Sequence, residues 1–195
     1  MKGSKSSMIQ NKDDLKHYLE MDKYALNRNG HCNLLLSKDL NWKFQIILRK
    51  HEYYYNTHNT IMTKIYGYWH KALGYKLGFD IPINVFEAGL HINHFGNIVV
   101  SPHARIGEFC DIHQGVNIGK GERDDKAPII GDNCWIGPGA KLYGGIIIGN
   151  EVMIGANAVV TKSFNQNSVS IAGIPAQIVS RRGKPITRTE RYKRY

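Results

Sequence analysis

Aliphatic residues recur at every sixth position between Val100 and Val160, and most are followed by a small or turn-prone residue. Nine of the ten aliphatic positions hold Ile or Val, and a gap of two periods after Ile118 leaves the phase unchanged. A helix repeats its apolar positions near 3.6 residues and a strand near 2, so neither alone explains this spacing. The pattern predicts a parallel β-helix with six-residue repeats, in which each coil buries its aliphatic side chains against the neighbouring coils.

A second phase of the same repeat lies two positions before each aliphatic residue and holds mostly small or β-branched residues. Two of the three cysteines, Cys110 and Cys134, fall on this phase. We therefore interpret them as packing residues of the coil walls and not as a redox pair. An odd number of cysteines also agrees with a reducing compartment.

The first 78 residues show helical periodicity instead. We expect a helix that is capped by Asp13 or Asp14, a second that begins at Ser37 and runs to about residue 55, and a third over residues 60–76 with Gly78 just past its end. A solenoid must cover its first coil. We therefore expect these helices to cap the β-helix, in preference to a role at a membrane surface.

Three segments follow from these patterns. Residues 1–78 form the helical region, residues 79–180 form the β-helix, and residues 181–195 form a basic tail. The first coil, from Phe79, is irregular. The repeat is interrupted at residues 119–128 by a charged, glycine-containing insert, which must project from a corner of the solenoid.

The net charge of +10 is concentrated at the two ends of the chain. Residues 1–78 carry a net +7, residues 79–178 a net −3 and residues 179–195 a net +6. Basic arms suit phosphate-bearing ligands, anionic glycans or an anionic membrane face at the inner membrane. No apolar run approaches the roughly 18 residues that would span a bilayer, and the N-terminus lacks a signal-peptide core, so we expect a cytoplasmic protein.

Three stretches resemble a known family: GLHINHFGNIVV, the closing AGIPAQIV and the insert that ends at Pro128. They are similar to the left-handed parallel β-helix acyltransferases, and most similar to the serine acetyltransferase branch. The helical prefix, with WKFQIILRKHEYYY, most resembles the enzymes of bacterial surface-polysaccharide gene clusters. The resemblance implies a left-handed, mainly β fold, acetyl-CoA as co-substrate without a metal, and a homotrimer with a CoA groove between subunits.

The resemblance also implies a catalytic base. His94 lies where the family has its base, and an imidazole with an ordinary pKa near 6.5 suits proton transfer at neutral pH. Asp80 matches, with an offset of one residue, the aspartate that orients this base. Glu87 and Asn84 are its rivals, and His113 is the reserve candidate for the base.

Coenzyme A would lie along backbone amides of the later coils, where Pro138 removes one N–H that some relatives use. The residues that match the family's CoA contacts are Gly137, Ala156, Thr161, Lys162, Pro175 and Arg181. Lys162 and Arg181 supply positive charge for its phosphates.

The acceptor site differs from that of serine acetyltransferases at two positions. Asn93 replaces an acidic residue before the base, and Ala127 replaces a histidine before Pro128. Without these charged groups, the ammonium and carboxylate of serine lose partners. We therefore predict a carbohydrate acceptor of the capsule or O-antigen type, contacted by Asn93, His113 and Gln114. Serine is the alternative acceptor.

Two further alternatives belong to other classes. A zinc enzyme on the same fold, like the γ-type carbonic anhydrases, requires three converging histidines, and the solenoid histidines do not match that spacing. A non-catalytic solenoid that binds nucleic acid or another anionic polymer would explain the basic tail, but it leaves the His94 motif unexplained. We expect no nucleic-acid partner.

Overall fold

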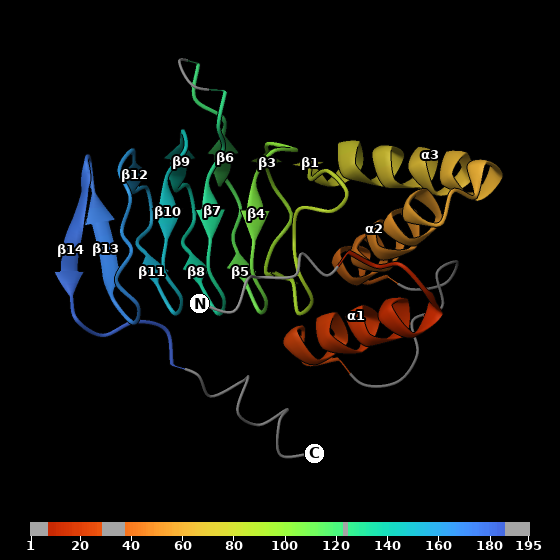
Figure 1. Cartoon of the computed structure of the whole chain (residues 1–195), viewed down its shortest axis with the longest axis horizontal. Helices are drawn as coiled ribbons and strands as arrows, with labels where there is room; N and C mark the ends of the chain where they lie inside the picture. Colours follow the sequence, from red (N-terminus) through yellow and green to blue (C-terminus); the bar gives the residue numbers. More distant parts are fainter. Residues whose placement is uncertain (1–7, 29–37, 123–124, 186–195) are drawn as a thin grey trace.

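The structure is a computed structural model that describes residues 8–28, 38–122 and 125–185. Three helices come first: α1 (Lys12–Ala25), α2 (Leu40–Asn56) and α3 (Thr60–Leu77). They lie together at one end of a long β-helix, next to its first coil (Figure 1). No helix among the described residues is long and apolar enough to cross a membrane.

The helix boundaries lie close to the predicted ones, but two caps differ. Asn11 caps α1, because its side chain accepts hydrogen bonds from the backbone of Asp13 and Asp14, and Asp14 completes a capping box. Asp39 caps α2 through Trp42 N, while the predicted Ser37 lies outside the described residues. Gly78 ends α3 in the left-handed conformation (φ 75°), as expected for this position.

Among the described residues, fourteen short strands build the β-helix. They form a five-stranded sheet in the order β1-β3-β6-β9-β12, which we call sheet A, a three-stranded sheet β10-β7-β4, sheet B, and a six-stranded sheet β14-β13-β11-β8-β5-β2, sheet C. The strands are β1 (Phe79–Asp80), β2 (His91–Ile92), β3 (Ile98–Val100), β4 (Arg105–Ile106), β5 (Asp111–Ile112), β6 (Asn117–Gly119), β7 (Ile129–Ile130), β8 (Trp135–Ile136), β9 (Lys141–Tyr143), β10 (Ile147–Ile148), β11 (Met153–Ile154), β12 (Val159–Val160), β13 (Ser170–Gly173) and β14 (Ala176–Ser180).

The six-residue repeat is confirmed by the strand register. On sheet C the aliphatic residues pair from coil to coil and form one buried stack of Ile92, Ile112, Ile136, Ile154 and Ile171. Each of these side chains is at most 1% exposed. Fully burying such a side chain contributes about 1.5–3 kcal/mol, so the stack is a main source of the stability of the β-helix.

The last coil closes with a hairpin. β13 and β14 are antiparallel, unlike the other strand pairs of the described residues. The sequence predicted the closing segment, but the six-residue repeat contains no signal for this reversal. The pair lies at the end of the β-helix opposite the helices (Figure 1).

A fully buried arginine joins the helices to the first coil. Arg49 pairs with Asp22 (Nε–Oδ2 2.8 Å) and Glu52 (Nη1–Oε2 3.0 Å). It also donates to the carbonyl oxygens of Phe86 and Glu87, each at 2.8 Å. The cap on the first coil was predicted, and Phe44, Leu48 and Leu77 do belong to the core of the β-helix, but the sequence did not reveal this ion cluster.

Candidate active site

One corner of the β-helix collects the candidate catalytic side chains. The chain leaves four strands of sheet C, β2, β5, β8 and β11, at this corner and turns toward sheet A. Because Ile92 pairs with Ile112 and Ile112 pairs with Ile136, the residues two positions later form a row. The row contains His94, Gln114, Pro138 and Ala156. We call it the His94 row.

His113 lies next to His94 at this corner. The ring centroids of the two histidines are 6.4 Å apart, and the His113 ring packs edge-on against Trp135 at 4.9 Å. The Asn93 amide lies 3.1 Å from His113 Nε2, so with Asn93 as the donor this nitrogen accepts. Burial lowers the pKa of His113, and His91 and His94 add to this effect while Asp111 opposes it. The corner thus combines the exposed imidazole of His94 with one whose burial favours the neutral form.

Gln114 occupies the next position of the His94 row. Its Oε1 is buried and has no hydrogen-bond partner among the described residues. Buried polar atoms of native proteins almost always have a partner. Among the described residues, Gln114 Oε1 is thus an unsatisfied acceptor in the His94 row.

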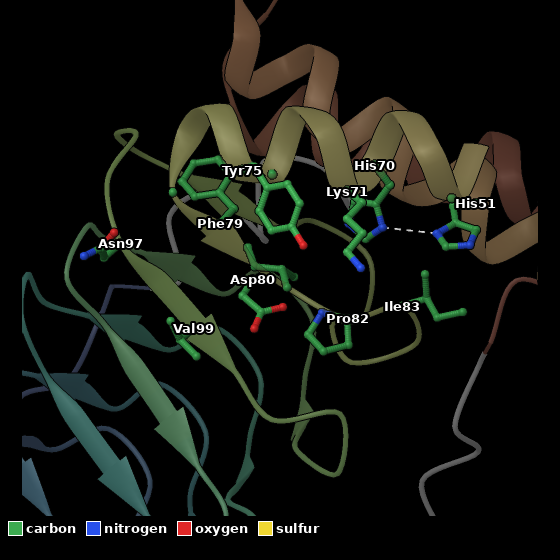
Figure 2. Close-up of a pocket in the computed structure, with 14 residues that line it drawn as sticks. His51, His70, Lys71, Tyr75, Phe79, Asp80, Pro82, Ile83, Asn97 and Val99 are labelled. Carbon is green, nitrogen blue, oxygen red and sulfur yellow. Dashed lines mark hydrogen bonds between the residues drawn. The ribbon is translucent and has the colours of Figure 1, made fainter. Parts of the chain in front are cut away.

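Asp80 does not reach His94 in this structure. It lies on β1 of sheet A, whereas His94 follows β2 of sheet C. Asp80 instead lines a pocket of about 730 Å³ between α3 and the first coil, together with His70, Lys71 and Tyr75 (Figure 2). No hydrogen bond joins Asp80 to His94 in the described part of the chain, so the structure does not support the predicted orienting role.

The two rivals of Asp80 are engaged elsewhere. Glu87 accepts a hydrogen bond of 2.5 Å from the hydroxyl of Tyr18. Asn84 exchanges side-chain hydrogen bonds of 2.9 Å with Asn56. Both serve the contact between the helices and the first coil.

The carboxylate–imidazole pair that the structure does contain was missed by the sequence analysis. His91 Nδ1 lies 2.5 Å from Asp111 Oδ1, and Lys184 Nζ lies 2.9 Å from the other carboxylate oxygen. Burial opposes ionisation of Asp111, but the hydrogen bond from His91 and the charge of Lys184 outweigh it and lower the pKa of Asp111. His91 and Asp111 pair in register on β2 and β5, but the irregular first coil between them hides this pairing from the six-residue spacing.

The residues expected to contact CoA separate into two groups. Thr161 and Lys162 line a groove of about 940 Å³ with Lys120, Tyr143 and Gly144, at the corner where the chain leaves sheet A. Lys162 also donates to Gln177 Oε1 at 2.9 Å. Arg181 lines a different hollow, of about 850 Å³, at the end of the β-helix.

The other group consists of Gly137, Ala156 and Pro175 and lies along the corner that carries the His94 row. Gly137 donates its N–H to the carbonyl of Ile154 at 2.8 Å, so this group is not available to a ligand. Ala156 is exposed, and its N–H has no partner in the part of the chain that the structure describes. Pro175 lies in the turn between β13 and β14. Of these three residues, Ala156 has the backbone N–H that best fits the expected hydrogen bond to CoA.

Comparisons with known proteins agree with this architecture. Residues 127–162 match the model of the bacterial transferase hexapeptide (six repeats). The serine acetyltransferase of Staphylococcus xylosus is 42% identical over 102 residues, which are 51% of this chain and 47% of that protein. The serine acetyltransferase of Synechococcus elongatus is 36% identical over 97 residues, which are 49% of this chain and 39% of that protein. The chain thus spans about half the length of these relatives, or less.

Solved structures show the same fold over more of the chain. The crystal structure of serine acetyltransferase from Brucella abortus superposes with a TM-score of 0.71 and 25% identity, and it covers 89% of this chain and 72% of that one. A structure of the enzyme from the same organism in complex with coenzyme A gives a TM-score of 0.69 at 24% identity, covering 89% of this chain and 71% of that one. The fold is a left-handed parallel β-helix with an N-terminal helical part.

These relatives correct one expectation. A carbohydrate acceptor was predicted from Asn93 and Ala127, and a place among the surface-polysaccharide enzymes from the helical prefix. The relatives at 36–42% identity and the similar structures are instead serine acetyltransferases. The prediction of a carbohydrate acceptor was wrong, because it treated two absent charges as if no other group could replace them. Over residues 127–162 the β-helix matches the bacterial transferase hexapeptide repeat, and the chain is similar in sequence and fold to serine acetyltransferases.

Proposed function

We propose that the protein is an acetyl-CoA-dependent serine O-acetyltransferase. The observation that carries the proposal is the 42% identity to a serine acetyltransferase over 102 residues, combined with histidines gathered at one corner of the matching β-helix. The co-substrate follows from the same relatives, one of which was solved in complex with coenzyme A. Because acetyl-CoA is an intracellular metabolite, we place the reaction in the cytoplasm.

His94 acts as the general base in this proposal. The serine hydroxyl oxygen attacks the thioester carbonyl carbon, and His94 removes the hydroxyl proton. When the tetrahedral intermediate collapses, the carbon–sulfur bond breaks and the CoA thiolate takes the proton from His94. The products are O-acetylserine and CoA with its free thiol. The exposed position of His94 allows both substrates to reach it, and a general base of this kind contributes roughly 10²–10⁴-fold to the rate.

Gln114 is our candidate for recognition of the serine ammonium. Asn93, which stands where the family has an acidic residue, is bonded to His113 and carries no charge. Gln114 Oε1 is a buried acceptor without a partner in the described residues, and it lies in the His94 row. An ammonium group that donates to it would satisfy this atom, and Asn93 and His113 would then position the acceptor hydroxyl.

Coenzyme A would be bound between two copies of the chain. The His94 row with Ala156 lies at one corner, and Thr161 with Lys162 lies at the next corner, on the other side of sheet A. Two corners of one triangular coil face different directions, so a single groove that contains both groups needs two chains. A closed ring of such heterologous contacts gives a cyclic oligomer, and a three-sided coil suits a homotrimer. Lys162 and Arg181 supply charge for the CoA phosphates.

The test is an assay of purified protein with acetyl-CoA and L-serine that measures release of the CoA thiol. We expect kcat/KM within the usual enzyme range, above about 10⁴ M⁻¹s⁻¹, and identification of O-acetylserine by mass spectrometry. D-serine and L-alanine serve as controls, because the first has the wrong stereochemistry and the second lacks the hydroxyl. Thiol release that does not depend on L-serine would show that the acceptor has been misassigned.

A further inference from the structure

The outer face of α3 is apolar although it is exposed. Ile61, Ile65, Tyr68, Trp69 and Tyr75 are each 40–75% exposed. Their spacing of mostly three or four residues places them along one side of the helix, with the exposed Ala72 between them. Monomeric proteins rarely expose contiguous apolar patches of this kind, and such patches mark interaction sites. We call these five residues the α3 stripe.

The residues that the structure describes leave the α3 stripe uncovered. The opposite side of α3 carries the contacts to the rest of the molecule. Tyr66 stacks on Tyr54 of α2 at 5.2 Å, and Leu77 belongs to the core of the β-helix. Gly74 lies so close to Phe79 that an added Cβ would be 2.6 Å from its carbonyl oxygen. In Figure 1, α3 lies at the upper edge of the helical region, with α2 on one side of it only.

The charges on α3 indicate what could cover the stripe. The helix contains Lys64, Lys71 and Lys76, all exposed, and no Asp or Glu between Thr60 and Leu77. Packing the stripe against a second copy would bring the lysines of two helices together without an acidic residue on either. Like charges that meet at an interface oppose association. An anionic surface, by contrast, would attract all three lysines while the apolar side chains are buried.

We propose that α3 docks on the anionic surface of a phospholipid bilayer, with its axis in the plane of the membrane. Tyr and Trp favour the membrane–water interface, where an apolar ring and a polar group are both satisfied. Ile61 and Ile65 would enter the boundary between headgroups and acyl chains, and the lysine side chains would extend to the lipid phosphates. This property is independent of the proposed acetyl transfer.

The first experiment measures co-sedimentation of the full-length protein with vesicles. We expect binding to vesicles that contain phosphatidylglycerol and little binding to vesicles of pure phosphatidylcholine. Each basic residue near an anionic surface contributes roughly fivefold, so three lysines predict a difference on the order of a hundredfold at low salt. High salt should weaken the binding. Equal binding to both vesicle types, or binding to neither, overturns the proposal.

Paired variants separate the α3 stripe from the general positive charge of the chain. Ile61→Ser with Tyr68→Ser should abolish vesicle binding, whereas Ile178→Ser with Val179→Ser, two exposed residues of β14, should preserve it. Lys64→Gln with Lys71→Gln should weaken binding about 25-fold, whereas Lys12→Gln with Lys16→Gln on α1 should change it little. Full binding by the Ile61/Tyr68 variant would mean that basic segments elsewhere attract the lipid, and the proposal would fail. Circular dichroism confirms that each variant is folded.

Two further measurements decide between lipid and a second copy. Trp69 fluorescence should shift to shorter wavelength with phosphatidylglycerol vesicles, and the shift should disappear in Trp69→Phe while Trp42 and Trp135 remain. Sedimentation velocity without lipid should give the same mass for the wild type and the Ile61/Tyr68 variant. A smaller mass for that variant, together with no fluorescence shift, would show that the stripe is a protein–protein interface.

Discussion

At the scale of single residues, His94 is the side chain on which the proposed chemistry depends. His94→Ala should lower kcat by roughly 10²–10⁴-fold, because a general base contributes about that much. The dissociation constant for CoA should remain within about twofold, since His94 addresses the acceptor hydroxyl. His17→Ala is the matched control, because this exposed histidine lies on α1, outside the β-helix and its corners. Stopped-flow or steady-state thiol release measures kcat, and calorimetry measures CoA binding.

For Gln114, a purely structural role and a role in binding the serine ammonium predict different kinetic results. Gln114→Met retains the volume but removes the acceptor Oε1. A hydrogen bond to a charged group contributes about 1.5–3 kcal/mol, so KM for L-serine should rise by roughly tenfold to a hundredfold while KM for acetyl-CoA stays constant. A variant that retains the wild-type KM for serine would assign the ammonium to another group.

At the residue scale, a local motif could be read from the sequence, whereas contacts that depend on register could not. His94 and His113 were the two candidates for the base, and the structure places them at one corner. The pair of His91 and Asp111 is separated by one coil of irregular length, and Lys184 approaches from the tail. No six-residue repeat describes that first coil, so its contacts could not be inferred from spacing.

At the scale of elements, the tail is tied to the β-helix by a buried charge. Lys184 Nζ bonds Asp111 and the carbonyl oxygen of Phe109, each at 2.9 Å, and the lysine side chain is 10% exposed. The lowered pKa of Asp111 means that its stabilising effect is fully present above the ordinary aspartate pKa, about 3.9, and is lost as the pH falls through the lower folded value.

Asp111→Asn should therefore destabilise the protein most at neutral pH. The difference in unfolding free energy between wild type and variant should stay constant from pH 7 to about pH 5 and shrink below about pH 4. Urea unfolding followed by circular dichroism at several pH values measures it. Asp125→Asn is the control, since Asp125 is fully exposed in the insert. A difference that grows toward acid pH would contradict the assigned ion pair.

The helical cap depends on a second buried charge, Arg49. Replacing it with methionine leaves Asp22 and Glu52 buried without their cation. Breaking a buried ion pair by removing one partner costs about 3–5 kcal/mol. Arg28→Met provides the comparison, because Arg28 pairs with Asp39 at the surface, and such pairs contribute at most about 1 kcal/mol. Chemical unfolding should show a large loss for Arg49→Met and little change for Arg28→Met.

The regular coils and the helices were accessible from the sequence because each rests on a short-range pattern. The repeat of Ile and Val predicted the stacked core, and helical spacing predicted α2 and α3 to within a few residues. Arg49 was not recognised as the link between them. A buried arginine looks in sequence like any polar residue on a helix. Apart from Glu52, its partners lie 27 and more than 30 residues away, at Asp22 and in the first coil.

At the scale of the whole molecule, the division of the candidate CoA site between two corners makes the arrangement of subunits testable. If His94 of one chain and Lys162 of its neighbour meet in one site, His94→Ala and Lys162→Glu damage different halves of it. Mixing the two variants under conditions that allow subunit exchange then creates interfaces in which both halves are intact. Random assembly makes about a quarter of the interfaces wild-type in a closed ring. Thiol release at low acetyl-CoA should therefore recover to roughly that fraction of the wild-type rate in the mixture, while each variant alone stays low.

The control is a mixture of His94→Ala with a His94→Ala/Lys162→Glu double variant. Every chain in this mixture lacks His94, so no interface is intact and the mixture should remain inactive. Activity of the first mixture that merely equals the average of its two components would place both residues in the site of one chain, and would remove the structural reason for an oligomer.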